Sequence, residues 1–161
     1  MRDVCDMCDG MSWEQVRERN RKRIARYGFT TVLVEGSPGS PPFGYTMVGL
    51  TKSGHPELLV TGLDDGAAQA MLSLFATMVL SGRESFVPGL ALLGDECSVY
   101  SLEVLHPEGV MIWAHEMYGR RLSAIQLVWT DDEGRFPWAP NADPELLQPL
   151  HGILPPSWGT G

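Results

Sequence analysis

The alternation of apolar and polar residues along the chain predicts five β-strands. Strands are indicated where short apolar runs are rich in β-branched residues or alternate with polar ones. The connections between the first three runs are short, which favours an antiparallel meander. The expected strands are Phe29–Glu35, Phe43–Leu50, Glu57–Thr61, Ser98–Leu105 and Leu122–Thr130.

Three helices are predicted from helical spacing and from the residues that begin and end helices. Ser12 and Gln15 form a capping box, and Gly28 suits the left-handed conformation that ends a helix. Asp64 and Asp65 are N-cap candidates for a second helix, which is apolar on nearly all sides and is expected to pack on the sheet. Helices and strands in mixed order predict an α+β fold with a mostly antiparallel sheet. The expected helices are Trp13–Tyr27, Ala67–Leu80 and Pro107–Tyr118.

The length of 161 residues predicts one domain with its own core. We expect residues 1–135 to form this single α+β domain, with residues 82–96 as a surface excursion because they show no period. Residues 136–161 hold six prolines and two tryptophans and no period. They are expected to form a C-terminal extension that packs on the domain or trails from it.

Charge is distributed unevenly along the chain. The net charge is −8 and the pI is about 4.9, which argues against a nucleic-acid partner because phosphate contacts need a basic face. The segment Trp13–Tyr27 carries six Lys or Arg and two Glu, a net charge of +4, which leaves −12 for the rest. This segment is either a solvated positive helix or an anion-binding face.

The chain shows no sign of secretion or of membrane insertion. It has no apolar signal region after Met1 and no run of about 18 apolar residues. Three cysteines, Cys5, Cys8 and Cys97, are too few and too irregular for a secreted disulfide scaffold. We therefore expect a cytoplasmic protein without a membrane partner.

Cys5 and Cys8 form a CxxC pair, which is the candidate metal site. Two thiolates at this spacing can share a zinc ion or close a redox disulfide. A structural zinc needs four ligands, so the rest of the set would have to come from His55, His106, His115, His151 or Cys97. Neighbouring aspartates raise thiol pKa values, which disfavours redox chemistry but not a cation. Plain reduced cysteines are the alternative, so zinc is a possible cofactor rather than a required one.

A loop with three ionisable residues joins two apolar strands. Lys52, His55 and Glu57 lie in or beside it. His55 and Glu57 are the catalytic candidates, because a carboxylate can hold one imidazole tautomer for general base catalysis. A histidine that stabilises the loop through hydrogen bonds is the alternative. The sequence places no Ser or Cys nucleophile beside the pair, so no triad is predicted.

Aromatic and polar residues on two strands suggest a wall for a ligand. Tyr45 and Trp129 are expected to form it if their strands are neighbours, and core packing is the alternative. In this hypothesis the charged loop and the late strand open onto a shared hollow. The candidate ligand-binding residues are Tyr45, Thr46, Lys52, His55, Gln126, Trp129 and Trp138.

Several motifs together resemble a known family. The chain contains Cys5-Asp6-Met7-Cys8-Asp9-Gly10-Met11-Ser12, Tyr45-Thr46-x-x-Gly49-Leu50, His55-Pro56-Glu57-Leu58, Gly62-Leu63, Gln126-Leu127-Val128-Trp129 and Arg135-Phe136-Pro137-Trp138. From Cys5 to Trp138 it is similar to the bacterial family of domain of unknown function 4262. The resemblance implies a bacterial, soluble, single-domain protein. It does not imply a particular activity. This chain has Tyr-Thr-Met-Val-Gly-Leu where the family pattern has Tyr-Thr-Val-Gly-Leu, and the extra residue shifts the strand register unless a bulge absorbs it.

These observations favour a binding module over an enzyme. A weaker likeness to suppressor-of-fused-type interaction domains, in strand order and Gly-Leu…Glu-Leu spacing, points the same way. We expect a small-molecule or protein-binding module without an assembled catalytic motif. The alternatives are a small metal-dependent enzyme, hydrolase-like, that uses the CxxC pair and a histidine, and a tailoring role in bacterial secondary metabolism.

Overall fold

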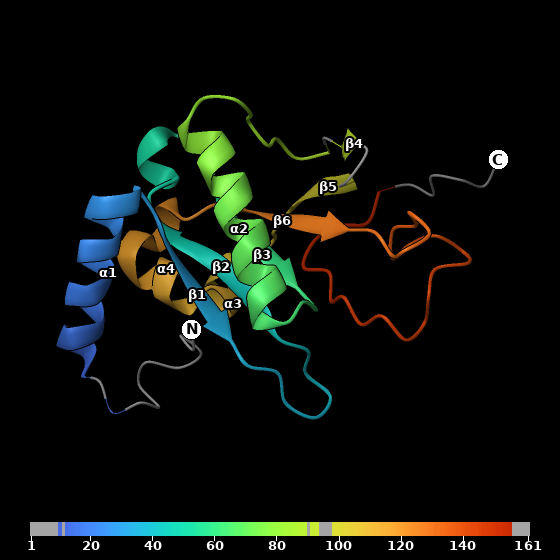
Figure 1. The fold of residues 1–161 in the computed structure, drawn as a ribbon, viewed down its shortest axis with the longest axis horizontal. Coiled ribbons are helices and arrows are strands. Elements are labelled where there is room, and N and C mark those ends of the chain that lie inside the picture. The colour runs from blue at the N-terminus through green and yellow to red at the C-terminus, as the bar shows by residue number, and fades with distance from the viewer. Residues whose placement is uncertain (1–9, 11, 90, 94–97, 156–161) are drawn as a thin grey trace.

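The computed structural model describes residues 10, 12–89, 91–93 and 98–155, with the backbone alone for 91–93. These residues form an α+β domain with one mixed sheet (Figure 1). The strands are β1 (Thr30–Val34), β2 (Phe43–Val48), β3 (Glu57–Thr61), β4 (Ala91–Leu93), β5 (Ser98–Glu103) and β6 (Ala124–Trp129). The helices are α1 (Trp13–Tyr27), α2 (Asp65–Leu80), α3 (Pro107–Val110) and α4 (Ile112–Tyr118), with short 3-10 helices η1 (Thr51–Ser53) and η2 (Gly119–Arg121).

The strand order in the sheet is β1-β2-β3-β6-β5-β4. β1, β2 and β3 form the expected antiparallel meander. β6 is then inserted between β3 and β5, parallel to β3 and antiparallel to β5. The mostly antiparallel α+β fold predicted from the sequence is confirmed, and the parallel β3–β6 pair is an addition to it.

Most predicted elements recur with small changes in their bounds. α1 and β3 have the predicted limits, and the capping box of Ser12 and Gln15 is present. The structure corrects two expectations. A short strand, β4, pairs with β5 inside the segment expected to be a surface excursion. The single helix expected from Pro107 to Tyr118 is broken at Met111, whose φ of −99° and ψ of 64° are not helical.

A β-bulge absorbs the extra residue of the second strand. Thr31 pairs with Thr46 and Thr30 with Val48, so Met47 has no opposite residue in β1. Because a bulge interrupts the alternation of side chains, Met47 and Val48 both belong to the core cluster beneath α4.

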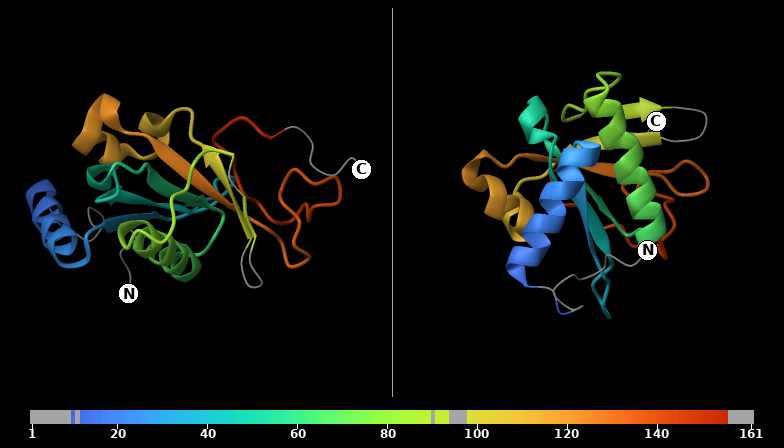
Figure 2. Two further views of the ribbon diagram at one scale, coloured as in Figure 1. Left: turned by 90° about the horizontal axis from the view of Figure 1, so that it is seen from above. Right: turned by 60° about the vertical axis from the view of Figure 1, so that its left-hand side comes forward.

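Helices cover both faces of the sheet. In the left view of Figure 2, α2 lies on one face and α3 and α4 lie on the other. α2 packs its buried residues on Leu58, Val60, Ile125 and Leu127, while α4 packs on the opposite side of β2 and β3. α1 lies beside α4 at one end of the molecule, and the segment after β6 lies at the other end.

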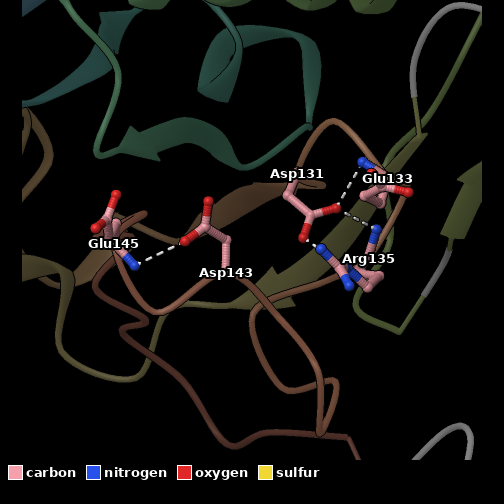
Figure 3. Close-up of polar contacts among 5 residues, drawn as sticks. All are labelled: Asp131, Glu133, Arg135, Asp143 and Glu145. Atoms are coloured by element: carbon pink, nitrogen blue, oxygen red, sulfur yellow. Dashed lines mark hydrogen bonds and ion pairs between the residues drawn. The ribbon is translucent and has the colours of Figure 1, made fainter.

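A tight turn directs the chain from β6 into its C-terminal segment. The Asp131 carboxylate accepts hydrogen bonds from the Glu133 and Arg135 amides and contacts the Arg135 guanidinium, each at 2.9 Å (Figure 3). Desolvation raises the pKa of Asp131, but these hydrogen bonds outweigh it and hold the pKa below its ordinary value. Asp143 accepts from the Glu145 amide in a second, similar turn.

The segment after this turn packs on the sheet. Phe136, Trp138 and Leu150 cover a cluster around Tyr100 and Val128. Trp138 stacks on Phe136 with ring centroids 5.0 Å apart. The C-terminal segment therefore contributes apolar side chains to the face of the sheet that α4 leaves uncovered. The domain boundary at residue 135 stays a prediction.

Candidate ligand-binding cleft

A cleft of about 480 Å³ lies between α1 and α4, above the bulge of β2. Helical residues form its two walls and the bulge supplies its floor. Its position follows from the fold, because α1 and α4 lie side by side at one end of the sheet (Figure 1). The cleft is lined by Arg17, Asn20, Arg21, Ile24, Ala25, Met47, Val48, Lys52, Trp113, Glu116, Met117 and Tyr118.

Two contacts hold α1 and α4 together at one end of the cleft. The Trp13 and Trp113 rings lie with centroids 4.1 Å apart. The Arg17 guanidinium donates to the Glu116 carboxylate. Both α1 residues belong to the first half of that helix, so its second half is left to form an open wall with Ile24 and Ala25.

The floor and much of the wall are apolar. Met47 and Val48 are each 2% exposed, and the bulge directs both toward the helices. Trp113 and Met117 complete the apolar surface from α4. Methionine side chains adapt to ligands of different shape, since they have several rotatable bonds and a polarisable sulfur.

Asn20 introduces an amide into this apolar wall. It is 6% exposed and occupies the inward stripe of α1, between Val16 and Ile24. Its Nδ2 donates to the Met47 sulfur at 3.9 Å, and sulfur is a weak acceptor. Buried amides normally find stronger partners than a thioether sulfur, so Asn20 keeps hydrogen-bonding capacity beside the cleft.

Cations border the cleft. Arg17 is paired with Glu116, and Arg21 with Glu18 on its own helix at 2.8 Å. Lys52 has no ion-pair partner within the described part of the chain. Lys52 was expected from the sequence to contact a ligand, and the structure does place it in the lining of a cleft.

Glu57 fixes the turn that carries Lys52. Its Oε2 accepts hydrogen bonds from the Thr51 amide at 2.7 Å and from the Thr51 hydroxyl. Its side chain is fully buried, and Oε1 has no hydrogen-bond partner among the residues that the structure describes. Burial raises the pKa of Glu57 above 4.5, against the opposing effect of the Thr51 hydrogen bonds. Glu57 therefore acts on the cleft indirectly, through η1.

Tyr118 lies between Glu57 and the cleft. Its hydroxyl oxygen accepts a hydrogen bond from the Gly49 amide at 3.3 Å. Burial raises the pKa of Tyr118, the Gly49 hydrogen bond lowers it, and the nearby Glu57 charge raises it further. The phenol is therefore neutral near pH 7 and can donate a proton to a hydrogen bond with a ligand.

His55 and Glu57 do not form the pair expected for general base catalysis. The Phe86 amide donates to Nε2 of His55 at 2.8 Å, so Nδ1 carries the proton and donates to the Pro56 carbonyl at 2.7 Å. No hydrogen bond joins His55 to Glu57 in the described structure. The alternative weighed above, a histidine that stabilises its loop, describes this geometry.

The shared hollow expected between His55 and Trp129 is not present. His55 precedes β3, whereas the Trp129 indole donates to the carbonyl of Thr61, the last residue of β3, at 2.9 Å. The physical reason is the parallel pairing of β3 with β6, which carries Trp129 to the far end of β3. Leu58 and Val60, both fully buried, lie between these ends.

The remaining candidate residues lie in the packed interior. Tyr45 is 1% exposed and accepts a hydrogen bond from the Trp113 amide, and burial raises its pKa to about 12. The Thr46 hydroxyl accepts a hydrogen bond from the Leu58 amide at 2.7 Å. Gln126 binds the C-terminal segment, and Trp138 packs on Phe136. Their roles as ligand contacts stay predictions, and the structure assigns each of them a protein partner.

A second cavity, also of about 480 Å³, lies beside α3 and η2. Its charged lining residues are the carboxylates Glu103 and Glu108 and the guanidinium Arg120.

The predicted metal site cannot be placed, because Cys5 and Cys8 lie outside the described residues. Within the residues that are described, no three His, Cys, Asp or Glu gather to hold a metal ion. Zinc therefore stays a prediction. In the same part of the chain, no helix is both long and apolar enough to cross a membrane.

The sequence pointed to Lys52 but missed the cleft itself. Two signals were available: the +4 charge of α1 and the polar Asn20 within its apolar stripe. Neither indicated that α4, nearly a hundred residues further on, would form the opposite wall.

Comparison with known proteins gives one match. A family model described as a domain of unknown function (DUF4262) covers residues 23–143. No curated protein and no solved structure matches the chain. The family resemblance seen in the motifs is thereby confirmed, whereas the likeness to suppressor-of-fused-type domains receives no support.

Proposed function

The chain belongs to the DUF4262 family, and we propose that it is a binding module that holds a small organic ligand in the cleft between α1 and α4. The observation that carries this proposal is the composition of the cleft. The open cleft of about 480 Å³ is lined mostly by apolar surface, together with a few polar groups. Sites for small ligands have this size and this lining.

The cleft is also preformed. The Trp13–Trp113 contact and the Arg17–Glu116 ion pair hold its walls at one end, and the bulge fixes its floor. A preformed site costs little ordering on binding, so more of the contact energy becomes affinity. Its polar groups are two arginines, a lysine, a glutamate, an amide and a phenol, which suit recognition and orientation of a ligand.

Binding can be tested with N-phenyl-1-naphthylamine, an uncharged dye that fluoresces in apolar sites. We expect saturable binding to the full chain. Ala25→Phe should weaken binding about tenfold or more (about 1.4 kcal/mol), because Ala25 is exposed and lines the cleft, so the new ring fills it.

Lys22→Phe is the matched control for this variant. Lys22 is exposed on the same helix and does not line the cleft, so the same ring is added outside the site. The dye should bind this control as it binds the parent protein. Absence of saturable binding, or equal binding to Ala25→Phe and the parent, would overturn the proposed function.

A further inference from the structure

We infer that the ligand of this cleft is an amphipathic organic anion, whose apolar body lies on Met47 and Trp113 and whose charged oxygens face Lys52 and Arg21. This inference rests on the proposed function and adds to it the chemical class of the ligand. It commits to an oxyanion carried by an apolar body, of the carboxylate or sulfonate kind.

The first support is local charge. Among the residues that line the cleft, Arg17, Arg21 and Lys52 are cations and only Glu116 is a carboxylate. Glu116 is already engaged by Arg17, so the lining keeps an excess of two positive charges. The remainder of the chain outside α1 carries −12, so this positive cleft is an exception on an acidic protein. Such a cleft attracts anions and raises their local concentration.

The second support is that two of the cations are available. Lys52 has no ion-pair partner in the described structure. Arg21 is held only by Glu18, in an exposed contact three residues away on the same helix. Exposed pairs of this kind contribute little stability, so Arg21 can turn to a ligand at small cost.

The third support is independent of charge. The buried Asn20 amide lines the cleft, and its Nδ2 donates to the Met47 sulfur, which is a weak acceptor. Nδ2 can donate to an oxyanion, and such hydrogen bonds to charged groups are stronger than neutral ones. The neutral Tyr118 hydroxyl lines the same cleft and supplies a further donor. An anion thus accepts a hydrogen bond from a buried amide whose protein partner is only a sulfur.

The test compares two dyes that differ by one group. 8-Anilinonaphthalene-1-sulfonate has the apolar body of N-phenyl-1-naphthylamine and adds a sulfonate. In the variant Arg21→Gln/Lys52→Gln we expect the affinity for the sulfonate to fall about tenfold (about 1.4 kcal/mol) and the affinity for the neutral dye to change less than twofold. Added salt should lower the affinity for the sulfonate dye and leave the affinity for the neutral dye unchanged, because salt screens the charges of Arg21 and Lys52.

A control variant removes the same charge elsewhere on the protein. Lys22→Gln/Arg26→Gln neutralises two exposed cations of α1 that do not line the cleft. It should bind both dyes as the parent does, and all variants should keep the parent's circular dichroism. If the two double variants lose equal affinity for the sulfonate, or if neither loses any, the anion inference is wrong. The proposed function would survive that result, whereas it would fail if the neutral dye did not bind.

Discussion

Gln126 and His151 are joined by a hydrogen bond that ties the C-terminal segment to the centre of the sheet. The buried Gln126 Oε1 accepts the His151 amide at 2.9 Å, and its Nε2 donates to the Pro149 carbonyl at 2.8 Å. Thr61 donates its hydroxyl to the same carbonyl at 2.7 Å. The Gln126 side chain on β6 therefore makes the backbone hydrogen bonds that a neighbouring strand would otherwise make to this segment. Gln126, a candidate ligand contact from the sequence, thus holds the chain's own C-terminal part.

Gly62 tests how closely this segment is packed. Its φ is +80°, and a Cβ there would lie 2.2 Å from the Leu147 carbonyl oxygen. Gly62→Ala should therefore displace the segment and lower the free energy of unfolding. Gly134→Ala is the control, because its φ is +77° and no atom lies within 4 Å of the added Cβ. In urea denaturation we expect Gly62→Ala to cost about 2 kcal/mol more than Gly134→Ala. An equal loss in free energy of unfolding for the two variants would mean that the C-terminal segment is not tightly packed against Gly62.

Asn20 should show a conflict between stability and binding. Replacing a poorly partnered buried amide with an apolar side chain of similar size removes a desolvation cost. Asn20→Leu should therefore raise the free energy of unfolding by about 1 kcal/mol. The same change should lower the affinity for 8-anilinonaphthalene-1-sulfonate about fivefold (about 1 kcal/mol), because it removes a hydrogen-bond donor to the oxyanion. Urea denaturation and dye titration measure the two effects, and a loss of stability would show that Asn20 is structural.

Glu57 should make stability depend on pH. Its pKa in the folded protein is raised by burial above 4.5, so the folded state holds a proton that the unfolded state releases. The stability associated with this proton is fully present below about 4.5 and is lost as pH rises through the folded pKa. Relative to Glu57→Gln, which does not titrate, the parent should therefore lose stability as pH rises from 4 toward 7. Denaturation at several pH values checks this, and a relative gain with rising pH would contradict the assignment.

Local signals in the sequence predicted the elements but not their long-range pairing. The capping box at Ser12, together with Gly28, gave α1 its observed limits, since both act within a few residues of the helix ends. The parallel pairing of β3 with β6 depends on contacts between residues more than sixty positions apart, which no local pattern encodes. The break at Met111 was likewise not predicted, because no proline or glycine stands at that position.

The candidate site could be predicted only in part, because local sequence signals do not show which distant elements pack together. Lys52 was identified because it is a charged residue in a short loop, and it does line the cleft. Tyr45 and Gln126 were chosen as polar groups on strands, but burial gives each of them a backbone partner within the fold. The alternation of a strand shows which residues share a face, and it does not show what covers that face.

The most direct test of the account is a crystal structure of the full chain with bound 8-anilinonaphthalene-1-sulfonate. We predict density for the dye between α1 and α4, with the rings on Met47 and Trp113 and the sulfonate within hydrogen-bond distance of Lys52 or Arg21. Density for the dye at any other place, with the α1–α4 cleft unoccupied, would contradict the central claim.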